Sequence, residues 1–481
     1  MTIAKATFNP FIGLYQNKFT SYSFSLISSK DFLSPVAILP LISYDRARLA
    51  TRLSQIGVVY FSFSAFYGPA QANQGFIIML AALVIGRTID GRRLIKDPLC
   101  ITSLLFIAYV IIRGAAAALN IPVERDHILE YTVDWAKLGL LPALFAAAAI
   151  RISRFQPFHI IGLAIAGFFL KITLRIDWTN PYAYFEKFFT QEHARATFGY
   201  SVINLPLWAL FFIIGLIIYS DDYVVDDSKV LMFIRTALFL ATINLLFFII
   251  IISKTRSIWI LSCIFIPTSI LLKIFQFNKI PKKIISLLIL TILLVPGYFI
   301  YTRYEFFKVR LTAEREVIRQ LLAADVQNVP RSSISERYYM YKVFFELAPE
   351  RPLLGWGPGQ TKRLLERSGY PGLDTAPHFH NIFVEIMLQL GLVGLGIFTA
   401  MIAILFKACL SLQHAVYDQS KFKWFLLCSA AIFCATGLIN HTLWSTATPY
   451  FFTMMAGIAY APRADRYIRG RLSPGEPVSA P

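Results

Sequence analysis

Along the chain, apolar residues gather into long runs that alternate with short polar or basic connections. Such runs predict helices that cross a membrane, which takes about 20 apolar residues when the helix crosses squarely. Several runs are shorter, so the pattern predicts about twelve transmembrane helices. The predicted spans are 54–68, 73–89, 99–119, 131–150, 158–175, 200–219, 231–252, 257–273, 284–301, 381–406, 424–441 and 445–461. The expected fold is therefore an all-α, polytopic membrane protein.

The segments outside these runs complete the predicted organisation. Residues 1–53 lack a signal-peptide pattern, and their longest apolar run is interrupted by Pro35 and Pro40, so we expect this segment on the cytoplasmic membrane surface. A long, charge-rich segment separates the ninth and tenth spans. The predicted order is a cytoplasmic or interfacial segment over 1–53, spans one to nine over 54–301, a periplasmic loop region over 302–380, spans ten to twelve over 381–461, and a cytoplasmic tail over 462–481.

Two helices are expected within the 302–380 segment. Apolar residues are interspersed with charged ones over 305–324, as in an amphipathic helix that lies along a membrane surface. A second helix is expected over 335–347, with Ser332 or Ser333 as its N-cap. The loop region is therefore predicted to be helical.

Composition supports the membrane assignment. Hydrophobic residues make up 56% and charged residues 15% of the 481 positions, and the mean hydropathy is +0.58. The hydrophobic fraction and the mean hydropathy are higher, and the charged fraction is lower, than in a soluble globular protein.

Lysine and arginine in the short connections predict the orientation, because they concentrate on the cytoplasmic side. They follow the even-numbered spans at Arg87, Arg92, Arg93, Lys96, Arg151, Arg154, Lys273, Lys279, Lys282, Lys283, Lys407, Lys421, Lys423, Arg463, Arg466, Arg469 and Arg471. The acidic connection 221–227 is the exception; we interpret it as a solvated cytoplasmic loop rather than as a magnesium–diphosphate site. Both termini are then cytoplasmic, and 302–380 lies outside.

A second basic population falls on the predicted outer side. Its members are Arg195, Lys254, Arg256, Arg303, Lys308, Arg310, Arg315, Arg319, Arg331, Arg337, Arg351, Lys362, Arg363 and Arg367. In a membrane, such cations indicate anionic partners, namely lipid phosphates or diphosphates. No nucleic acid is expected as a partner, because nothing resembles a groove-reading module.

The tenth span opens with three polar residues. Asn381, Glu385 and Gln389 are spaced i, i+4 and i+8, so they form one stripe on a helix. Polar groups at membrane depth are costly unless they face a protein interior or an aqueous cavity, and they often mark function. The stripe is therefore a candidate site.

Histidine provides the candidate base. His380 and His378 precede the stripe, and a neutral imidazole can accept the proton of an attacking hydroxyl. Either histidine could be the base, and an interfacial histidine that hydrogen-bonds the loop is an equally good interpretation. A zinc site is less favoured because no cysteine or carboxylate cluster has ligand spacing; no metal or cofactor is predicted.

Arginine provides the candidate anion site. Lys254 and Arg256 lie in a tight outer hairpin between spans seven and eight, and Arg195 lies where the 176–199 loop enters span six. The guanidinium fork matches phosphate oxygens. Anchoring of these side chains at the membrane interface is the simpler alternative. Asp134 and Lys137 are expected to neutralise each other within span four.

Four features occur in a fixed order along 190–400. They are Arg256-Ser257-Ile258-Trp259 at a helix start, Arg337 in the outer loop, Pro352-Leu353-Leu354-Gly355-Trp356-Gly357-Pro358-Gly359, and His380-Asn381 followed by Gly391. This order resembles the O-antigen ligase family and the wider ligase/polymerase superfamily. The resemblance implies a metal-independent, inverting glycosyltransferase of the bacterial inner membrane that faces the periplasm.

The resemblance also implies substrates and residue roles. The donor would be O-antigen glycan on undecaprenyl diphosphate and the acceptor lipid A-core. His380 would be the essential histidine, and Arg256 and Arg195 the diphosphate-binding arginines. Lys254, Arg337, His378 and Asn381 complete the predicted substrate-binding set.

Other functions remain open at this point. An O-antigen polymerase or a protein O-oligosaccharyltransferase would use the same donor with another acceptor. A lipid-linked-glycan flippase belongs to another class and would carry polar residues throughout the bilayer core rather than at one face.

Overall fold

The structure is a computed structural model that describes part of the chain. The described residues are 35–191, 194–276, 286, 289–290, 294, 297–298, 301–312, 315–323, 332–410, 419–440 and 447–468. The chain divides into two compact units, residues 1–48 and 49–481. The packing and the site described below belong to the second unit.

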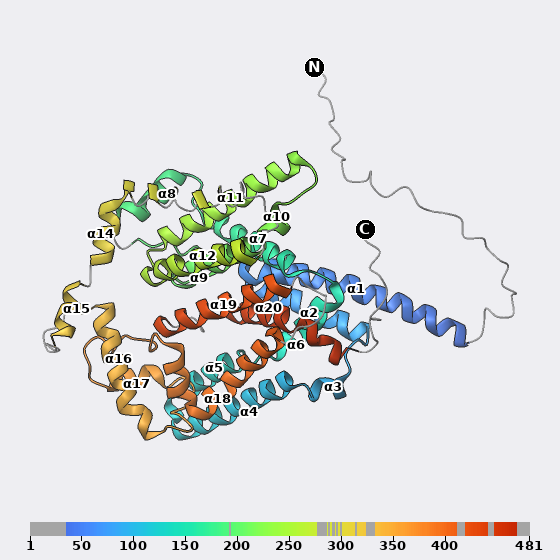
Figure 1. The fold of residues 1–481 in the computed structure, drawn as a ribbon. Coiled ribbons are helices and arrows are strands. Elements are labelled where there is room, and N and C mark those ends of the chain that lie inside the picture. The colour runs from blue at the N-terminus through green and yellow to red at the C-terminus, as the bar shows by residue number, and fades with distance from the viewer. Residues whose placement is uncertain are drawn as a thin grey trace, which may run out of the picture. The chain divides into compact units, whose positions relative to one another are not determined.

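Helices form nearly all of the regular structure of the described residues, apart from one isolated bridge between Ile89 and Ile468 (Figure 1). The helices are α1 (Pro35–Tyr67), α2 (Pro69–Ile85), α3 (Gly91–Ile95), α4 (Pro98–Asn120), α5 (Arg125–Ala136), α6 (Leu141–Ser153), α7 (Pro157–Thr173), α8 (Pro181–Thr190), α9 (Asn204–Ile218), α10 (Ser220–Val224), α11 (Lys229–Ile252), α12 (Arg256–Gln276), α14 (Tyr304–Thr312), α15 (Arg315–Leu322), α16 (Ser333–Leu347), α17 (Thr361–Arg367), α18 (Ile382–Leu410), α19 (Gln419–Ile439) and α20 (Thr448–Tyr460). The predicted helical class is confirmed.

Six helical stretches of the described chain are long and apolar enough to cross a membrane. They are Pro98–Asn120, Pro122–Ser153, Lys229–Ile252, Arg256–Phe275, Ile382–Leu410 and Ser420–Ile439. The apolar helices Pro69–Ile85, Pro157–Thr173 and Asn204–Ile218 are shorter. The protein is thus a multi-pass membrane protein, but the count of about twelve spans is not confirmed. The predicted ninth span, 284–301, lies largely outside the described residues.

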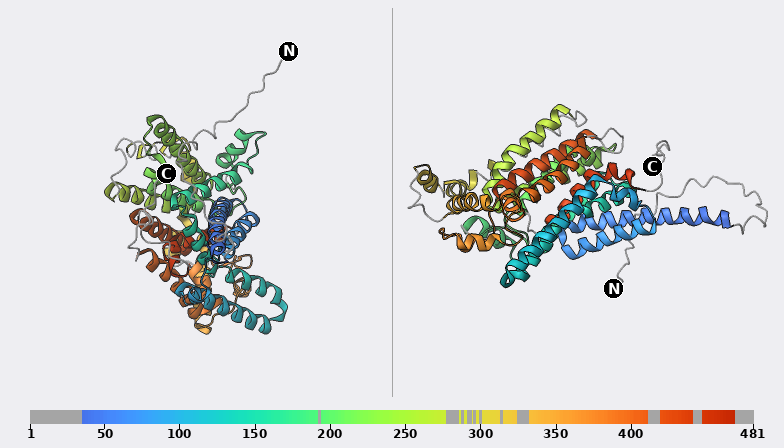
Figure 2. Two further views of the ribbon diagram at one scale, coloured as in Figure 1. Left: turned by 90° about the vertical axis from the view of Figure 1, so that its right-hand side faces the viewer. Right: turned by 90° about the horizontal axis from the view of Figure 1, so that it is seen from below.

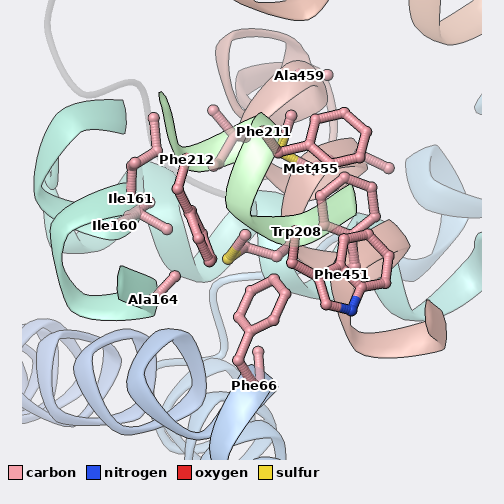
Figure 3. Packing of buried hydrophobic residues seen from close by; sticks show 14 of the residues in the cluster. Phe66, Ile160, Ile161, Ala164, Trp208, Phe211, Phe212, Phe451, Met455 and Ala459 are labelled. Atoms are coloured by element: carbon pink, nitrogen blue, oxygen red, sulfur yellow. The ribbon is translucent and has the colours of Figure 1, made fainter. Parts of the chain in front are cut away.

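The shortest of these helices, α9, shows why hydropathy alone does not count spans. Every one of its residues is buried, and it contacts α7, α11, α12 and α19. Its Trp208 and Phe212 pack on Phe66 of α1, with ring centroids 5.6 and 5.0 Å apart (Figure 3). A helix that is apolar on all sides can therefore be surrounded by protein rather than by lipid.

The helix expected over 335–347 is present as α16, which begins at Ser333. The single amphipathic helix expected over 305–324 is instead two helices, α14 and α15, and residues 313–314 lie outside the described residues. The Ser332 hydroxyl caps α16 by accepting from the amides of Ile334 and Ser335, both at 3.2 Å. α14 lies beside α8, whereas α16 and α17 lie near the end of α19 and the start of α18 (Figures 1 and 2).

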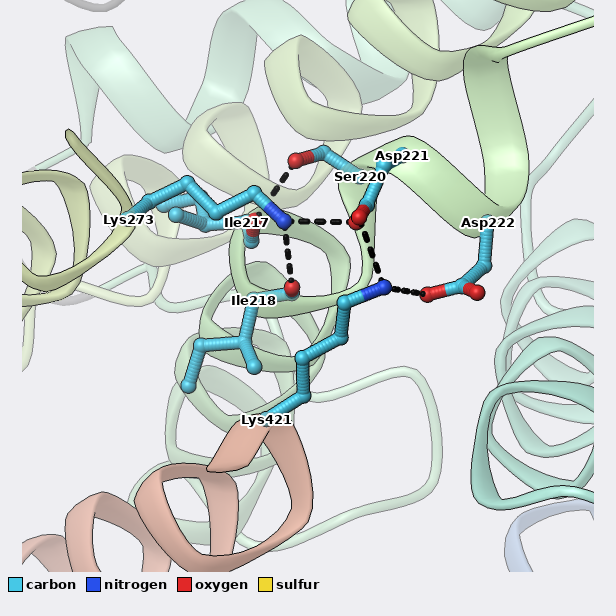
Figure 4. A network of polar contacts seen from close by, with 7 residues as sticks. All are labelled: Ile217, Ile218, Ser220, Asp221, Asp222, Lys273 and Lys421. Atoms are coloured by element: carbon cyan, nitrogen blue, oxygen red, sulfur yellow. Dashed lines mark hydrogen bonds and ion pairs between the residues drawn. The ribbon is translucent and has the colours of Figure 1, made fainter. Parts of the chain in front are cut away.

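A buried ionic cluster corrects part of the interpretation of 221–227 as a solvated loop, because Asp221 is buried although Asp227 is exposed. Asp221 is buried, and its carboxylate lies 2.5 Å from Nζ of Lys273 on α12 and 2.6 Å from Nζ of Lys421 on α19 (Figure 4). Lys421 also pairs with Asp222 at 2.7 Å. Burial raises the pKa of Asp221, but the lysine hydrogen bonds outweigh burial and hold that pKa below its usual range. The two lysines thus join α12 and α19 to the start of α10.

The predicted tenth span is divided into two helical halves. At Gly391 the α18 backbone has φ 67° and ψ −173°, a region that essentially only glycine adopts. Asn381, Glu385 and Gln389 all precede this break. The break shapes the candidate site.

Candidate active site

The glycine-rich loop after α16 pairs with the broken part of α18. The amides of Trp356 and Gly357 donate to the carbonyls of Leu388 and Gln389 at 2.8 and 2.9 Å. In the other direction, the amides of Leu392 and Val393 donate to Pro352 and Leu353 at 2.9 and 3.1 Å. These bonds satisfy backbone groups that the break removes from the helical ladder.

Glycine is required on both sides of this pairing. A Cβ on Gly391 would lie 2.2 Å from the Leu353 carbonyl oxygen, and one on Gly355 would lie 2.6 Å from the backbone of Gln389. Both residues also have positive φ. The two glycines therefore allow the loop and the helix to approach at backbone distance.

Side chains of α4 hydrogen-bond both the glycine-rich loop and the broken part of α18. Arg113 donates to the carbonyls of Leu354 and Gly355, both at 2.9 Å, and the Tyr109 hydroxyl donates to the carbonyl of Leu390 at 2.6 Å. Sequence analysis overlooked both residues. The signal available was a charged residue, Arg113, near the end of an otherwise apolar run.

The predicted polar stripe is buried inside the protein. Glu385 accepts from the Thr361 hydroxyl at 2.7 Å, from the Gln389 amide at 2.6 Å and from the backbone N–H of Phe379 at 3.1 Å. At Glu385 and Gln389 the stripe therefore faces the glycine-rich loop and the histidine loop rather than an open cavity.

Gln389 uses both ends of its amide in the same network. Its Oε1 accepts from Nε1 of Trp135 on α5 at 2.8 Å and from the backbone N–H of Gly359 at 2.9 Å. Its Nε2 donates to Thr361 at 2.9 Å as well as to Glu385. The network thus fixes α5, the glycine-rich loop and the start of α18 to one another.

Asn381 closes the stripe at the start of α18. Its Oδ1 accepts from the amides of Phe383 and Val384 at 2.9 and 3.2 Å, the geometry of an N-cap. Its Nδ2 donates to the Tyr341 hydroxyl of α16 at 2.8 Å. Asn381, a predicted substrate-binding residue, has a structural role in this arrangement.

The two histidines lie beside each other in the loop before α18. Their ring centroids are 4.4 Å apart, and the His380 amide donates to Nδ1 of His378 at 3.3 Å. His380 has φ 51°, a left-handed conformation that is uncommon for residues other than glycine. Its buried Nδ1 has no hydrogen-bond partner among the described residues.

Burial holds both imidazoles in the neutral form near pH 7. Burial lowers the pKa of His378 to about 4. Burial, with the charges of His378 and Arg337, lowers the pKa of His380 to about 3. The positive charge of Arg337 therefore acts on His380, and this histidine can accept a proton at neutral pH.

A chain of hydrogen bonds connects Arg337 to the start of α12. Arg337 donates to Oδ1 of Asn440 at 3.3 Å, and Nδ2 of Asn440 donates to the Ser257 hydroxyl at 3.0 Å. Ser257 follows Arg256. The predicted residues Arg337 and Arg256 are thus brought to the same region by Asn440, which sequence analysis did not identify.

Backbone contacts bring Arg195 to this region as well. The amide of Ala196 donates to the carbonyl of Ile252 at 3.2 Å, and the Thr255 hydroxyl donates to the carbonyl of Val202 at 2.7 Å. Burial, together with the charge of Arg256, lowers the pKa of Arg195. Two arginines that are distant in sequence therefore act on each other electrostatically.

Lys254 lies in the hairpin but is directed into the protein. It is buried, has φ 54°, and its Nζ donates to the carbonyl of Gln191 at 2.7 Å. It joins the hairpin to the loop that carries Arg195. The simple anchoring role considered for Lys254 is wrong, because an anchoring amine would be exposed.

Several of the cations predicted on the outer side have carboxylate partners. These pairs are Arg303 with Glu186, Lys308 with Glu305, Arg319 with Glu316, Lys362 with Glu366, and Arg363 with Glu124. They weaken the inference that all the outer cations serve an anionic ligand. The expected pair Asp134–Lys137 is confirmed at 2.6 Å. Within the described ranges, no group of three or more His, Cys, Asp and Glu side chains could hold a metal ion.

A family comparison covers most of this region. Residues 241–399 match the family model described as O-antigen ligase. These residues belong to the O-antigen ligase family. The match contains Arg256, Arg337, the glycine-rich loop, His380 and the α18 break, whereas Arg195 lies before it and Asn440 after it. A comparison with individual curated proteins gives no match to the chain.

Family membership indicates a membrane protein that processes glycans by ligase- or polymerase-type chemistry. The family implies lipid-linked glycans and lipid acceptors as partners within the membrane. A neutral imidazole such as that of His380 can accept a hydroxyl proton, and guanidinium groups can bind phosphate oxygens.

Proposed function

We propose that the protein is an O-antigen ligase that transfers O-antigen glycan from undecaprenyl diphosphate to lipid A-core. The observation that carries the proposal is the neutral His380 beside Arg337, with Arg256 and Arg195 connected to the same region. A base and several cations are what transfer from a lipid diphosphate requires.

In the proposed reaction, a hydroxyl oxygen of the acceptor attacks the anomeric carbon of the donor glycan. The new glycosidic bond forms as the bond between that carbon and the diphosphate oxygen breaks, which inverts the anomeric configuration. His380 takes the hydroxyl proton. Arg256, Arg195 and Arg337 stabilise the negative charge on the departing diphosphate.

Two helices support an active site on the periplasmic side. Arg256 and Lys273 are at opposite ends of α12, about 26 Å apart at the helical rise. α19 runs antiparallel to α12, with Lys421 near its start and Asn440 just after its end, about 28 Å apart at the helical rise. Since a bilayer hydrocarbon core is about 30 Å thick, these lengths support a position of the arginine region and the ionic cluster of Asp221 near opposite membrane surfaces. The basic even-numbered connections favour the cytoplasm for the cluster.

The proposal can be tested by transfer in vitro with purified protein and undecaprenyl-diphosphate-linked glycan. Three acceptors should be compared: lipid A-core, a second lipid-linked glycan and a peptide. Transfer to lipid A-core identifies a ligase, whereas transfer only to the second or third acceptor identifies a polymerase or a protein glycosyltransferase. Donor movement across vesicles without transfer would identify a flippase.

Variants test the residue roles in the same assay. His380→Ala should lower kcat by about 10² to 10⁴ while donor binding is retained, the usual effect of losing a general base, and His378→Ala should be milder. Arg256→Ala should weaken donor use by roughly one to two decades, with poor rescue by Arg256→Lys. Arg92→Ala, an exposed arginine in α3, is the matched control. Normal turnover by a folded His380→Ala protein would refute the assigned base.

A further inference from the structure

The buried carboxylate of Glu385 is not used in the proposed transfer. It is fully buried one turn into α18, and it accepts three hydrogen bonds, from Thr361, Gln389 and the backbone of Phe379. Phe379 directly precedes His380. Glu385 therefore holds the backbone of the loop that carries the proposed base.

The direction of the hydrogen bonds around Glu385 is set by donors that cannot reverse. The backbone N–H groups of Phe379 and Gly359 and the indole N–H of Trp135 donate only. The last two occupy Oε1 of Gln389, so its NH₂ group must point towards Thr361 and Glu385. Position 385 must then accept from both Gln389 and Phe379.

We propose that Glu385 is a positioning residue, which acts by fixing the Phe379 backbone and thereby the left-handed conformation of His380. The proposal rests on the proposed role of His380 as the base. A carboxylate suits position 385 because each of its two oxygens accepts hydrogen bonds and neither donates.

Glutamine at position 385 cannot reproduce this pattern. If its oxygen faces the Phe379 N–H, its NH₂ group faces the NH₂ group of Gln389. If it is turned round, its NH₂ group faces the Phe379 N–H. Reversing Gln389 only moves the conflict to Trp135 and Gly359. Every orientation leaves two donors facing each other, which is costly in a buried site.

Exchanging the two residues removes the conflict. In the double variant Glu385→Gln/Gln389→Glu, the carboxylate at 389 accepts from Trp135 and Gly359, and it also accepts from the new amide at 385. The oxygen of that amide is then free to accept from Phe379. The exchange restores the backbone contact while it keeps the same two side-chain types.

The experiment compares Glu385→Gln, the exchanged double variant and Glu385→Asp with wild-type protein. Glu366→Gln, an exposed residue paired with Lys362, is the matched control. The measurements are kcat, KM for the donor and the acid limb of the pH–kcat/KM profile, with thermal unfolding in detergent. We expect Glu385→Gln to lower kcat roughly 10- to 100-fold with little change in KM, and to move the acid limb because the surroundings of His380 change. The double variant should recover most of kcat.

Glu385→Asp keeps the acceptors but withdraws them by about one methylene group, so it should also lower kcat and spare KM. Wild-type kcat and pH profile in Glu385→Asp would overturn the proposal even if Glu385→Gln is not recovered folded. A loss of transfer that matches the loss of folded protein would instead make Glu385 a purely structural residue. His380→Ala is measured in parallel. If it turns over normally, the assigned base fails and the positioning role fails with it, whereas an inactive His380→Ala beside a fully active Glu385→Gln refutes only the positioning role. The proposed function itself fails only if wild-type protein transfers no glycan to lipid A-core.

Discussion

Gly391→Ala tests whether the backbone break in α18 is needed for stability and transfer. The alanine Cβ would lie 2.2 Å from the Leu353 carbonyl oxygen and 2.6 Å from the Gly355 amide nitrogen. Contacts this close cannot be relieved by a side-chain rotation, because both partners are backbone atoms. The glycine-rich loop must therefore move away from α18.

The size of the effect follows from two contributions. Holding alanine in the backbone conformation of Gly391 costs about 1–3 kcal/mol. If the loop separates, the four backbone hydrogen bonds across the break are lost at about 1 kcal/mol each. Because the loop must move, the expected loss of unfolding free energy is roughly 5–7 kcal/mol. This loss is large against the stability of a typical protein domain.

The matched control is Gly396→Ala in the second half of α18. A Cβ on Gly396 meets nothing within 4 Å, and alanine favours a helix over glycine by about 1 kcal/mol, so this variant should unfold at the same or a higher temperature. Thermal unfolding of both proteins in detergent, together with transfer activity, provides the comparison. Equal stability and activity of Gly391→Ala and Gly396→Ala would refute the role of the break.

Two further perturbations test the charges. Arg337→Gln should raise the pKa of His380 by removing a nearby positive charge, so the acid limb of the pH–kcat/KM profile should move to higher pH; an unmoved limb would exclude this coupling. Asp221→Asn should leave Lys273 and Lys421 buried without their shared charge and lower stability by roughly 3–5 kcal/mol. Thermal unfolding measures that loss. The folded fraction should still bind the donor, because the Asp221 cluster and Arg256 lie at opposite ends of α12. A loss of donor binding in the folded fraction would contradict this separation of the cluster from the donor site.

The sequence predicted well those elements whose evidence is local. Most apolar runs within the described residues correspond to helices, and the serine before α16 is its N-cap, because capping and hydropathy depend on neighbouring residues. The number of spans was not predictable in the same way. The residues of α9 are apolar because protein surrounds them on every side, and composition cannot distinguish that environment from lipid.

The candidate site was predictable to the extent that its residues are unusual in a membrane segment. His380, Arg256 and Arg337 stood out as polar groups near apolar runs. Contacts through Asn440 connect Arg337 to Ser257, the residue after Arg256. Trp135 did not stand out, because an indole in an apolar helix is ordinary. Its hydrogen bond to Gln389 joins residues far apart in sequence, and no local pattern specifies such a contact.

The acidic segment after α9 shows the opposite error. Four aspartates within seven residues indicated solvent, since charged clusters are usually hydrated. Asp221 is instead buried between Lys273 and Lys421. The partners lie on two helices much later in the chain, so only the tertiary structure could reveal that the charge is neutralised.

In the proposed mechanism, one set of positive charges serves two steps. Before the donor binds, Arg337 and burial keep His380 neutral, so that the histidine can accept a proton. When the diphosphate enters, its negative charge offsets the arginines, and the pKa of His380 should rise as the acceptor hydroxyl releases its proton. The same arginines then stabilise the charge on the departing diphosphate. A base with a low pKa in the free protein is therefore compatible with catalysis, because the donor itself supplies the charge that makes His380 a stronger base.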